Sequence, residues 1–263
     1  MGFNKYVEVG KISLSNSLVY LMDFLAKSLF IGLIIFIFIN LWKVVYGDST
    51  SLIDGFTINM MVWYLVMTES IVTSQGKLLE EIGEEIRSGN IAQSLNKPYN
   101  FIVFKYASGF GNTFLRFIMT FTIGAIITLI FVGGINVQLV HLPLILLTVL
   151  FALTINFLMM ALLGIFAFWL EDARALHFIY QKFVFVLGGM LLPLELFPQW
   201  LGDFSRVLPF SYVAYHPAKL WVMFNWSDFV NVIMNQLFWI VIFIITIALV
   251  YRICIEKISI NGG

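Results

Sequence analysis

Long apolar stretches separated by short polar segments dominate this sequence. Six of them are long enough, or nearly so, to cross the roughly 30 Å hydrocarbon core of a bilayer as helices. They run over Leu21 to Trp42, Phe56 to Thr73, Thr113 to Gly133, Leu142 to Phe168, Phe178 to Leu194 and Phe229 to Tyr251. The stretches are continuously apolar, whereas strands of a membrane barrel alternate between apolar and polar residues. The pattern predicts an all-α polytopic membrane protein with six transmembrane helices in one domain, residues 1–263.

The composition agrees with this prediction. Hydrophobic residues make up 60% of the chain and charged residues only 11%, whereas a soluble domain carries about 25% charged residues. The net charge is zero and no basic stripe is visible, which argues against nucleic-acid binding. The single cysteine, Cys254, excludes a disulfide within the chain.

Lysine and arginine are distributed unevenly between the two sides of the predicted membrane. If the N-terminus is inside, eleven of them lie on the inside, three on the outside (Lys43, Arg206 and Lys219) and Arg116 within a span. Positive residues favour the cytoplasmic side, so we expect both termini in the cytoplasm, which requires an even number of spans. No feature of a second membrane is visible, so we expect the plasma membrane.

The longest inside segment, Gln75 to Phe104, begins with an amphipathic pattern. Leu79, Ile82 and Ile86 share one face of a predicted helix, and four glutamates occupy the other. Gly89 interrupts the pattern, and a further turn would end before Pro98. One interpretation is a helix lying on the lipid head groups, and the other is a helix docked in a partner protein. Because an anionic cytoplasmic leaflet attracts basic segments, the acidic face favours the partner protein.

The outside segment from Gly188 to Trp221 contains four of the six prolines of the chain. Helices usually end before a proline, so this segment should consist of short pieces. It is nevertheless rich in Leu, Phe, Trp and Tyr, which favours burial. A re-entrant pair of helices over about residues 195–217 explains both observations. An ordinary extracellular loop with interfacial aromatic residues explains them equally well.

Two ionisable residues lie within predicted spans. Glu69 is near the inner end of the second span and Arg116 near the inner start of the third. Adjacent antiparallel spans would bring them to a similar depth, so we predict an ion pair. Separate extension of each side chain to the interface is an equally good interpretation.

The sequence offers no catalytic or metal-binding motif. A P-loop is absent, since Gly76-Lys77 is followed by Leu78 and no glycine lies five positions earlier. No HExxH motif occurs, and the three histidines lie far apart without acidic partners at helical spacing. These absences argue against an intramembrane enzyme, and the few ionisable groups at mid-membrane argue against an ion-coupled carrier or channel.

Two ordered patterns carry a family resemblance. The first loop contains Glu85, Gly89, Leu95, Pro98 and Lys105 in this order, and FWLEDAR occupies Phe168 to Arg174. The outer segment contains Gly188, Gly189, Pro193, Leu194, Pro198, Trp200, Leu208, Pro209 and Phe210. With an amphipathic N-terminal segment and six spans, the chain resembles the membrane subunits of type 2 ATP-binding cassette (ABC) exporters, in the branch whose permease is a separate polypeptide.

The resemblance implies the following roles. Residues 78–95 would be a cytoplasmic coupling helix that docks on a separate ATPase, which would hold ATP and Mg²⁺, whereas this chain would hold no cofactor. The coupling residues would be Leu79, Ile82, Glu85, Ile86, Gly89, Leu95 and Pro98. The outer gate would consist of Gly188, Gly189, Pro193, Pro198, Trp200 and Pro209.

The resemblance also implies a second permease, identical or related, and the direction of export. The apolar spans, with 27 phenylalanines in the chain, suit an amphipathic or hydrophobic substrate such as a drug, a lipid or an antimicrobial peptide. An ATP-independent channel or ion-coupled carrier is the alternative function.

Overall fold

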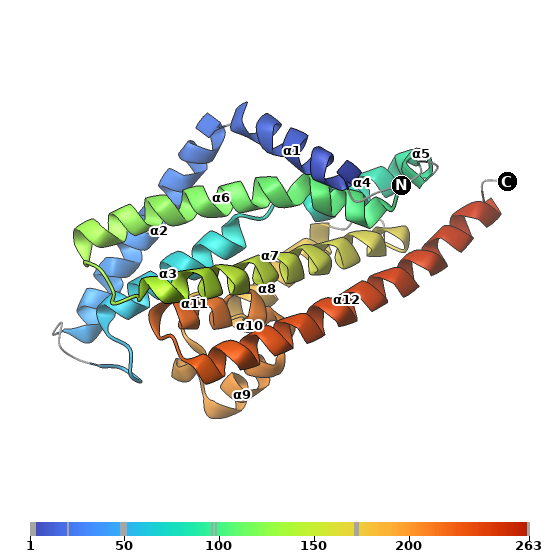
Figure 1. Cartoon of the computed structure of the whole chain (residues 1–263). Helices are drawn as coiled ribbons and strands as arrows, with labels where there is room; N and C mark the ends of the chain where they lie inside the picture. Colours follow the sequence, from blue (N-terminus) through green and yellow to red (C-terminus); the bar gives the residue numbers. More distant parts are fainter. Residues whose placement is uncertain are drawn as a thin grey trace.

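The computed structural model describes residues 4–19, 21–47, 52–95, 97, 99–170 and 174–261, which form a bundle of helices (Figure 1). The α-helices are α1 Asn4–Val19, α2 Leu21–Tyr46, α3 Ile58–Thr73, α4 Leu78–Arg87, α5 Asn90–Leu95, α6 Phe101–Phe131, α7 Leu142–Ile165, α8 Arg174–Val186, α9 Gln199–Val207, α10 Pro209–Val213, α11 Tyr215–Val222 and α12 Trp226–Asn261. Three short 3-10 helices are η1 Leu139–His141, η2 Phe166–Phe168 and η3 Leu194–Leu196. No β-strand occurs among the described residues, so the all-α prediction is confirmed.

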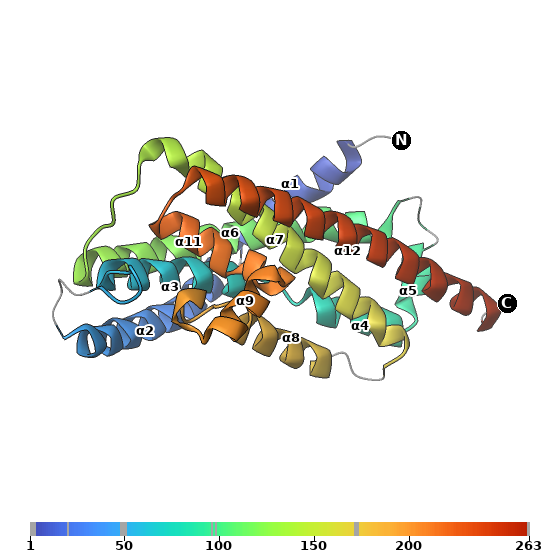
Figure 2. The ribbon, with the colours of Figure 1, turned by 90° about the horizontal axis from the view of Figure 1, so that it is seen from below.

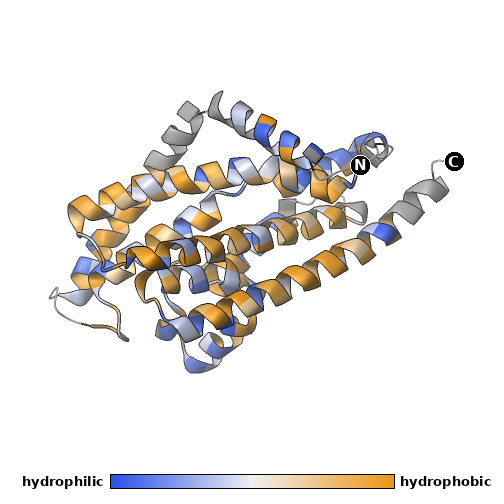
Figure 3. Cartoon of the chain, in the orientation of Figure 1, coloured by the Kyte–Doolittle hydropathy of each residue, from blue (hydrophilic) through white to orange (hydrophobic). Residues whose placement is uncertain are grey.

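Three segments of the described chain are long and apolar enough to cross a membrane. They are α6, the continuous stretch of η1 and α7 (Leu139–Ile165), and α12 as far as Cys254. Parts of α2 (Phe30–Tyr46) and α8 (Ala175–Val186) are shorter apolar helices. Figure 3 shows apolar residues along most of α6, α7 and α12. The chain is therefore a multi-pass membrane protein.

The interior of the bundle is built around α3 and α7. Nearly every residue of α3 is buried, because α2, α6 and α11 all pack on it. α7 packs against α12 and α4. In its most apolar 18-residue stretch, 61% of the residues are buried, whereas in the corresponding stretch of α12 only 17% are buried. α7 therefore lies inside the bundle and α12 on its surface. In Figure 2, α8 and α9 lie on the opposite side of the bundle from α1.

The two ends of the bundle differ. Helices α4 and α5 lie at the end where α1 begins and α12 finishes, which we call the α4 end (Figure 1). The connection between α6 and η1 and the start of α12 lie at the opposite end, which we call the far end (Figure 1).

Several helix bounds depart from the predicted spans, and two of the departures have a local cause. α6 begins at Phe101, before the predicted Thr113, because Asn100 caps it: its side chain accepts a hydrogen bond from the amide of Val103 at 3.1 Å. The added turns are too polar to be recognised as a span, and α1 packs along α6. α8 stops at Val186, before the predicted Leu194, because Gly189 takes a left-handed φ of 63° that turns the chain.

Candidate functional site

The apolar face of α4 is buried in this chain. Leu79 and Ile82 are fully buried, and α4 packs on α7 and η2. Gly164 of α7 makes this close approach feasible, since a Cβ at Gly164 would lie only 3.0 Å from the Cβ of Ile82. Leu79 and Ile82 are therefore core contacts, and in this conformation neither side chain is accessible to another protein.

The opposite face of α4 is open. Glu81, Glu84, Arg87 and Gly89 are all exposed. Gly89 has a positive φ of 75°, and its amide donates to the carbonyl oxygen of Ile86 at 3.1 Å, which closes the end of the helix.

Of the other predicted coupling residues, Ile86, Leu95 and Pro98, the structure describes only some. Ile86 is half-buried. Leu95 is the last residue of α5, and its side chain is outside the described part of the chain. Pro98 lies outside the described residues altogether.

Close side-chain contacts connect the glutamates of α4 to two neighbouring helices. The Lys105 ammonium on α6 lies 2.6 Å from Glu85 Oε1 and 3.8 Å from Glu81 Oε2. On α8, His177 Nδ1 lies 2.5 Å from Glu80 Oε1. Glu85 and Lys105 belong to the same ordered pattern in the sequence, and in the structure their side chains form an ion pair. His177 was not predicted as a partner, because no local spacing connects residues 80 and 177.

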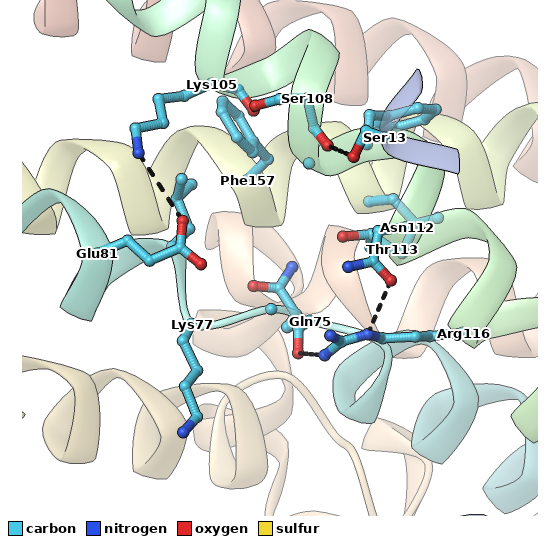
Figure 4. Close-up of a pocket in the computed structure, with 15 residues that line it drawn as sticks. Ser13, Gln75, Lys77, Glu81, Lys105, Ser108, Asn112, Thr113, Arg116 and Phe157 are labelled. Atoms are coloured by element: carbon cyan, nitrogen blue, oxygen red, sulfur yellow. Dashed lines mark hydrogen bonds and ion pairs between the residues drawn. The ribbon is translucent and has the colours of Figure 1, made fainter. Parts of the chain in front are cut away.

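A polar cavity of about 350 Å³ lies beside α4, between α1, α6, α7 and the α3–α4 connection. Its charged lining residues are Lys77, Glu81, Lys105 and Arg116, and its walls also carry amide and hydroxyl groups (Figure 4). Arg116 donates from Nε to Asn112 Oδ1 at 3.1 Å and from Nη1 to the backbone carbonyl of Gln75 at 3.4 Å.

Glu69 does not line this cavity. It is 3% exposed, in the buried part of α3. Among the described residues no salt bridge joins its carboxylate to the Arg116 guanidinium. The structure therefore does not support the predicted ion pair.

Gly188 and Gly189 form a tight turn in the interior of the bundle. A Cβ at Gly188 would overlap the carbonyl oxygen of Val184 and lie 3.0 Å from that of Phe210. Helix α3 binds the turn: Tyr64 donates to the carbonyl of Gly189, and Thr68 Oγ1 donates to the carbonyl of Met190 at 2.6 Å. Only glycine fits at this turn, and α3 fixes its position.

The remaining predicted gate residues surround this turn. Pro193 and Pro209 are buried, whereas Pro198 and Trp200 are exposed at the start of α9. Pro198 immediately precedes α9, and Pro209 is the first residue of α10. Both positions are as expected for a proline at the start of a helix.

A polar cluster that the sequence did not predict lies in the same region. The Lys219 ammonium is 2.7 Å from Glu195 Oε1, and Tyr215 donates to the same oxygen at 2.6 Å. These contacts join η3 to α11 through an ion pair between Glu195 and Lys219.

The His216 ring, on α11, stacks on Tyr212 with centroids 4.2 Å apart. His216 therefore packs as an aromatic residue. In the described part of the chain, no group of three or more His, Cys, Asp or Glu residues could hold a metal ion.

Comparison with known proteins gives a match to a family model. No curated protein matches the chain. The family model described as ABC-2 family transporter protein matches residues 29–262, which cover α2 from its third turn onward and all the later helices. This range contains α4, the glycine turn and every residue of the cavity lining except Ser13. The chain therefore belongs to the ABC-2 family of transporter proteins.

Proposed function

We propose that this chain is the membrane-spanning permease subunit of an ATP-driven exporter. The observation that carries the proposal is the two-sided attachment of α4. Its apolar face packs on α7, its glutamates pair with Lys105 of α6 and His177 of α8, and its remaining polar face is open. A short helix held this way transmits a push on its exposed face to three helices of the bundle.

The exposed face, with Glu84, Arg87 and Gly89, is the proposed contact with a separate ATPase that binds ATP and Mg²⁺. Leu79, Ile82 and Glu85 act as transmitting residues within this chain, and they make no contact with the ATPase. Ile86, Leu95 and Pro98 complete the proposed coupling segment.

We propose six spans with both termini in the cytoplasm of a plasma membrane. The α4 end is then cytoplasmic and the far end is outside. α8 has 13 residues, about 20 Å of helix, which is less than the roughly 30 Å of hydrocarbon. The broken segment from η3 to α11 makes up the missing length as a re-entrant element. Such irregular backbone requires burial in protein, and α10 and α11 are largely buried.

The outer gate of the proposed exporter is this re-entrant element, with the glycine turn at Gly188 and Gly189 as its hinge. Pro193, Pro198 and Pro209 break it into short helices, and Trp200 is its most exposed aromatic residue. α8 exposes several large apolar side chains, among them Phe178, which suits contact with a second permease. We propose an amphipathic or hydrophobic substrate, because the spans offer few polar groups.

Charge reversal on the open face of α4 tests the proposal. The chain is co-expressed with a candidate ATP-binding cassette ATPase, and copurification and ATPase activity are measured. Glu84→Lys should reduce copurification at least tenfold, while the chain still inserts in the membrane. Glu8→Lys, an exposed glutamate on α1, serves as the matched control and should behave as the unmodified chain. Equal copurification of the two variants would remove α4 as the docking surface.

A further inference from the structure

The polar cavity beside α4 carries an excess of positive charge. Three cationic side chains, Lys77, Lys105 and Arg116, line it, against one carboxylate, Glu81, which gives a formal charge of +2. Glu85 binds Lys105 from outside the lining and reduces the sum to +1. In Figure 4 the Lys105 side chain points toward Glu81, and the Lys77 side chain extends away from both.

Neutral hydrogen-bonding groups occupy the same space. The side-chain amide of Gln75 lies between Glu81 and Arg116, and that of Asn112 lies beside Arg116 (Figure 4). Asn112 Oδ1 accepts from Arg116 Nε, which orients the amide and holds the planar guanidinium. A guanidinium flanked by amides is a favourable site for phosphate oxygens, which accept several charge-assisted hydrogen bonds at once.

An apolar groove of about 340 Å³ lies next to this cavity, between α6, α7 and α12. Phe157 lines both spaces. Tyr106 lies beside Phe157 with ring centroids 5.0 Å apart and hydrogen-bonds to Thr154 at 3.0 Å. Val103 and Ile244, which also line the groove, are exposed. The groove thus opens toward the outside of the bundle, where a lipid chain has access.

We propose that the polar cavity binds the phosphate of an anionic phospholipid head group, whose acyl chain lies in the apolar groove. Positive charge, fixed donors and an adjacent apolar groove form one site for a molecule with a phosphate head and an aliphatic tail. In the proposed orientation the cavity lies at the cytoplasmic face, where anionic lipids meet basic pockets between helices. A free phosphate ion satisfies the polar cavity alone, whereas a phospholipid also explains the groove. This lipid binding does not depend on ATPase docking or on transport.

Two glutamates on α4 provide a matched test. Both Glu81 and Glu84 are exposed, so Gln at either position should be tolerated. Glu81 lines the cavity and Glu84 does not. The probe is phosphatidylglycerol with a fluorophore on its tail, and its binding to the purified full chain in detergent is followed by anisotropy. Glu81→Gln removes the one negative charge of the lining and should tighten binding about fivefold, whereas Glu84→Gln should leave it unchanged.

Removal of a cavity cation should act in the opposite direction. Arg116→Gln should weaken binding of the same probe about fivefold or more. Lys97→Gln removes an exposed cation outside the cavity lining and should have no effect. If Arg116→Gln does not fold, the comparison of Glu81→Gln with Glu84→Gln still tests the proposal. Equal effects of Glu81→Gln and Glu84→Gln would overturn the site and indicate general surface attraction.

Competition identifies the source of the phosphate. Unlabelled phosphatidylglycerol should displace the probe, and phosphatidylcholine, whose head group adds a cation, should displace it at least tenfold less well. Displacement of the probe by millimolar inorganic phosphate would show that the cavity binds free phosphate, and it would overturn the proposal of phospholipid binding. Equal competition by the two lipids would overturn the charge-selective site.

Discussion

Truncation of Ile82 to alanine should loosen α4 from the bundle while leaving its exposed face unchanged. Ile82 is fully buried, and it packs on Gly164, which has no side chain that can move into the vacated space. Replacement of a buried isoleucine by alanine costs roughly 2–5 kcal/mol, with larger costs where the site cannot collapse. α4 lies at the edge of the bundle beside a polar cavity, so we take the lower end, about 2 kcal/mol.

Amide hydrogen exchange of the 78–87 segment measures this effect directly. If α4 exchanges through local opening, a loss of about 2 kcal/mol accelerates exchange about thirtyfold. Glu84→Ala, on the exposed face of the same helix, should change exchange by less than twofold. The same Ile82→Ala protein should lose stimulation of a bound ATPase, since the helix no longer transmits movement to α7.

A double variant tests the specific contact. Gly164→Ala alone should destabilise α4, because its Cβ would lie 3.0 Å from the Cβ, 3.2 Å from the Cγ2 and 3.4 Å from the Cδ1 of Ile82. Ile82→Ala removes the Cγ2 and Cδ1 atoms, so the two changes together should cost less than their sum. Additive effects, or unchanged exchange in Ile82→Ala, would refute the reasoning that α4 is held by this contact.

Two further predictions concern the proposed re-entrant element. Gly188→Ala should destabilise the fold by at least about 2 kcal/mol, measured as thermal stability in detergent, because its Cβ meets backbone that cannot yield. Lys219→Met should lower the free energy of unfolding by about 3 kcal/mol, because it leaves the Glu195 carboxylate without its cation. Adding Glu195→Gln should restore most of this loss, and no recovery would contradict the reasoning that the isolated carboxylate causes it.

The sequence predicts helices well here because their signals are local. Apolar length predicts α6, α7 and α12, and glycine or proline marks the end of α8 and the start of α9. The period of Leu79 and Ile82 correctly indicates that one face of α4 is buried. It does not indicate what covers that face, because periodicity carries no information about the partner. The cover is α7 of the same chain, and Gly164 provides the room.

Contacts between distant residues were beyond the sequence pattern. Glu195 and Lys219 are separated in the sequence by α9 and α10, and the fold of this segment brings them together. Glu80 and His177 meet because α4 and α8 pack against each other. The expected pairing of Glu69 with Arg116 assumed that similar depth means proximity. Depth is one coordinate of three, and the rotation of each helix about its axis decides which side chains face each other.

Helix α3 provides a physical connection between the glycine turn and α4. The middle of α3 binds the glycine turn through Tyr64 and Thr68, and beyond its C-terminal end residues 74–77 lead directly into α4. Because nearly all of α3 is buried, it cannot bend or rotate without moving its neighbours, and a close-packed interior transmits displacement with little loss. In the proposed exporter, a push on the exposed face of α4 would reach the carbonyls of Gly189 and Met190 through one helix. The turn that α3 binds is a position where only glycine fits, so it has little room to accommodate such a shift without moving its neighbours.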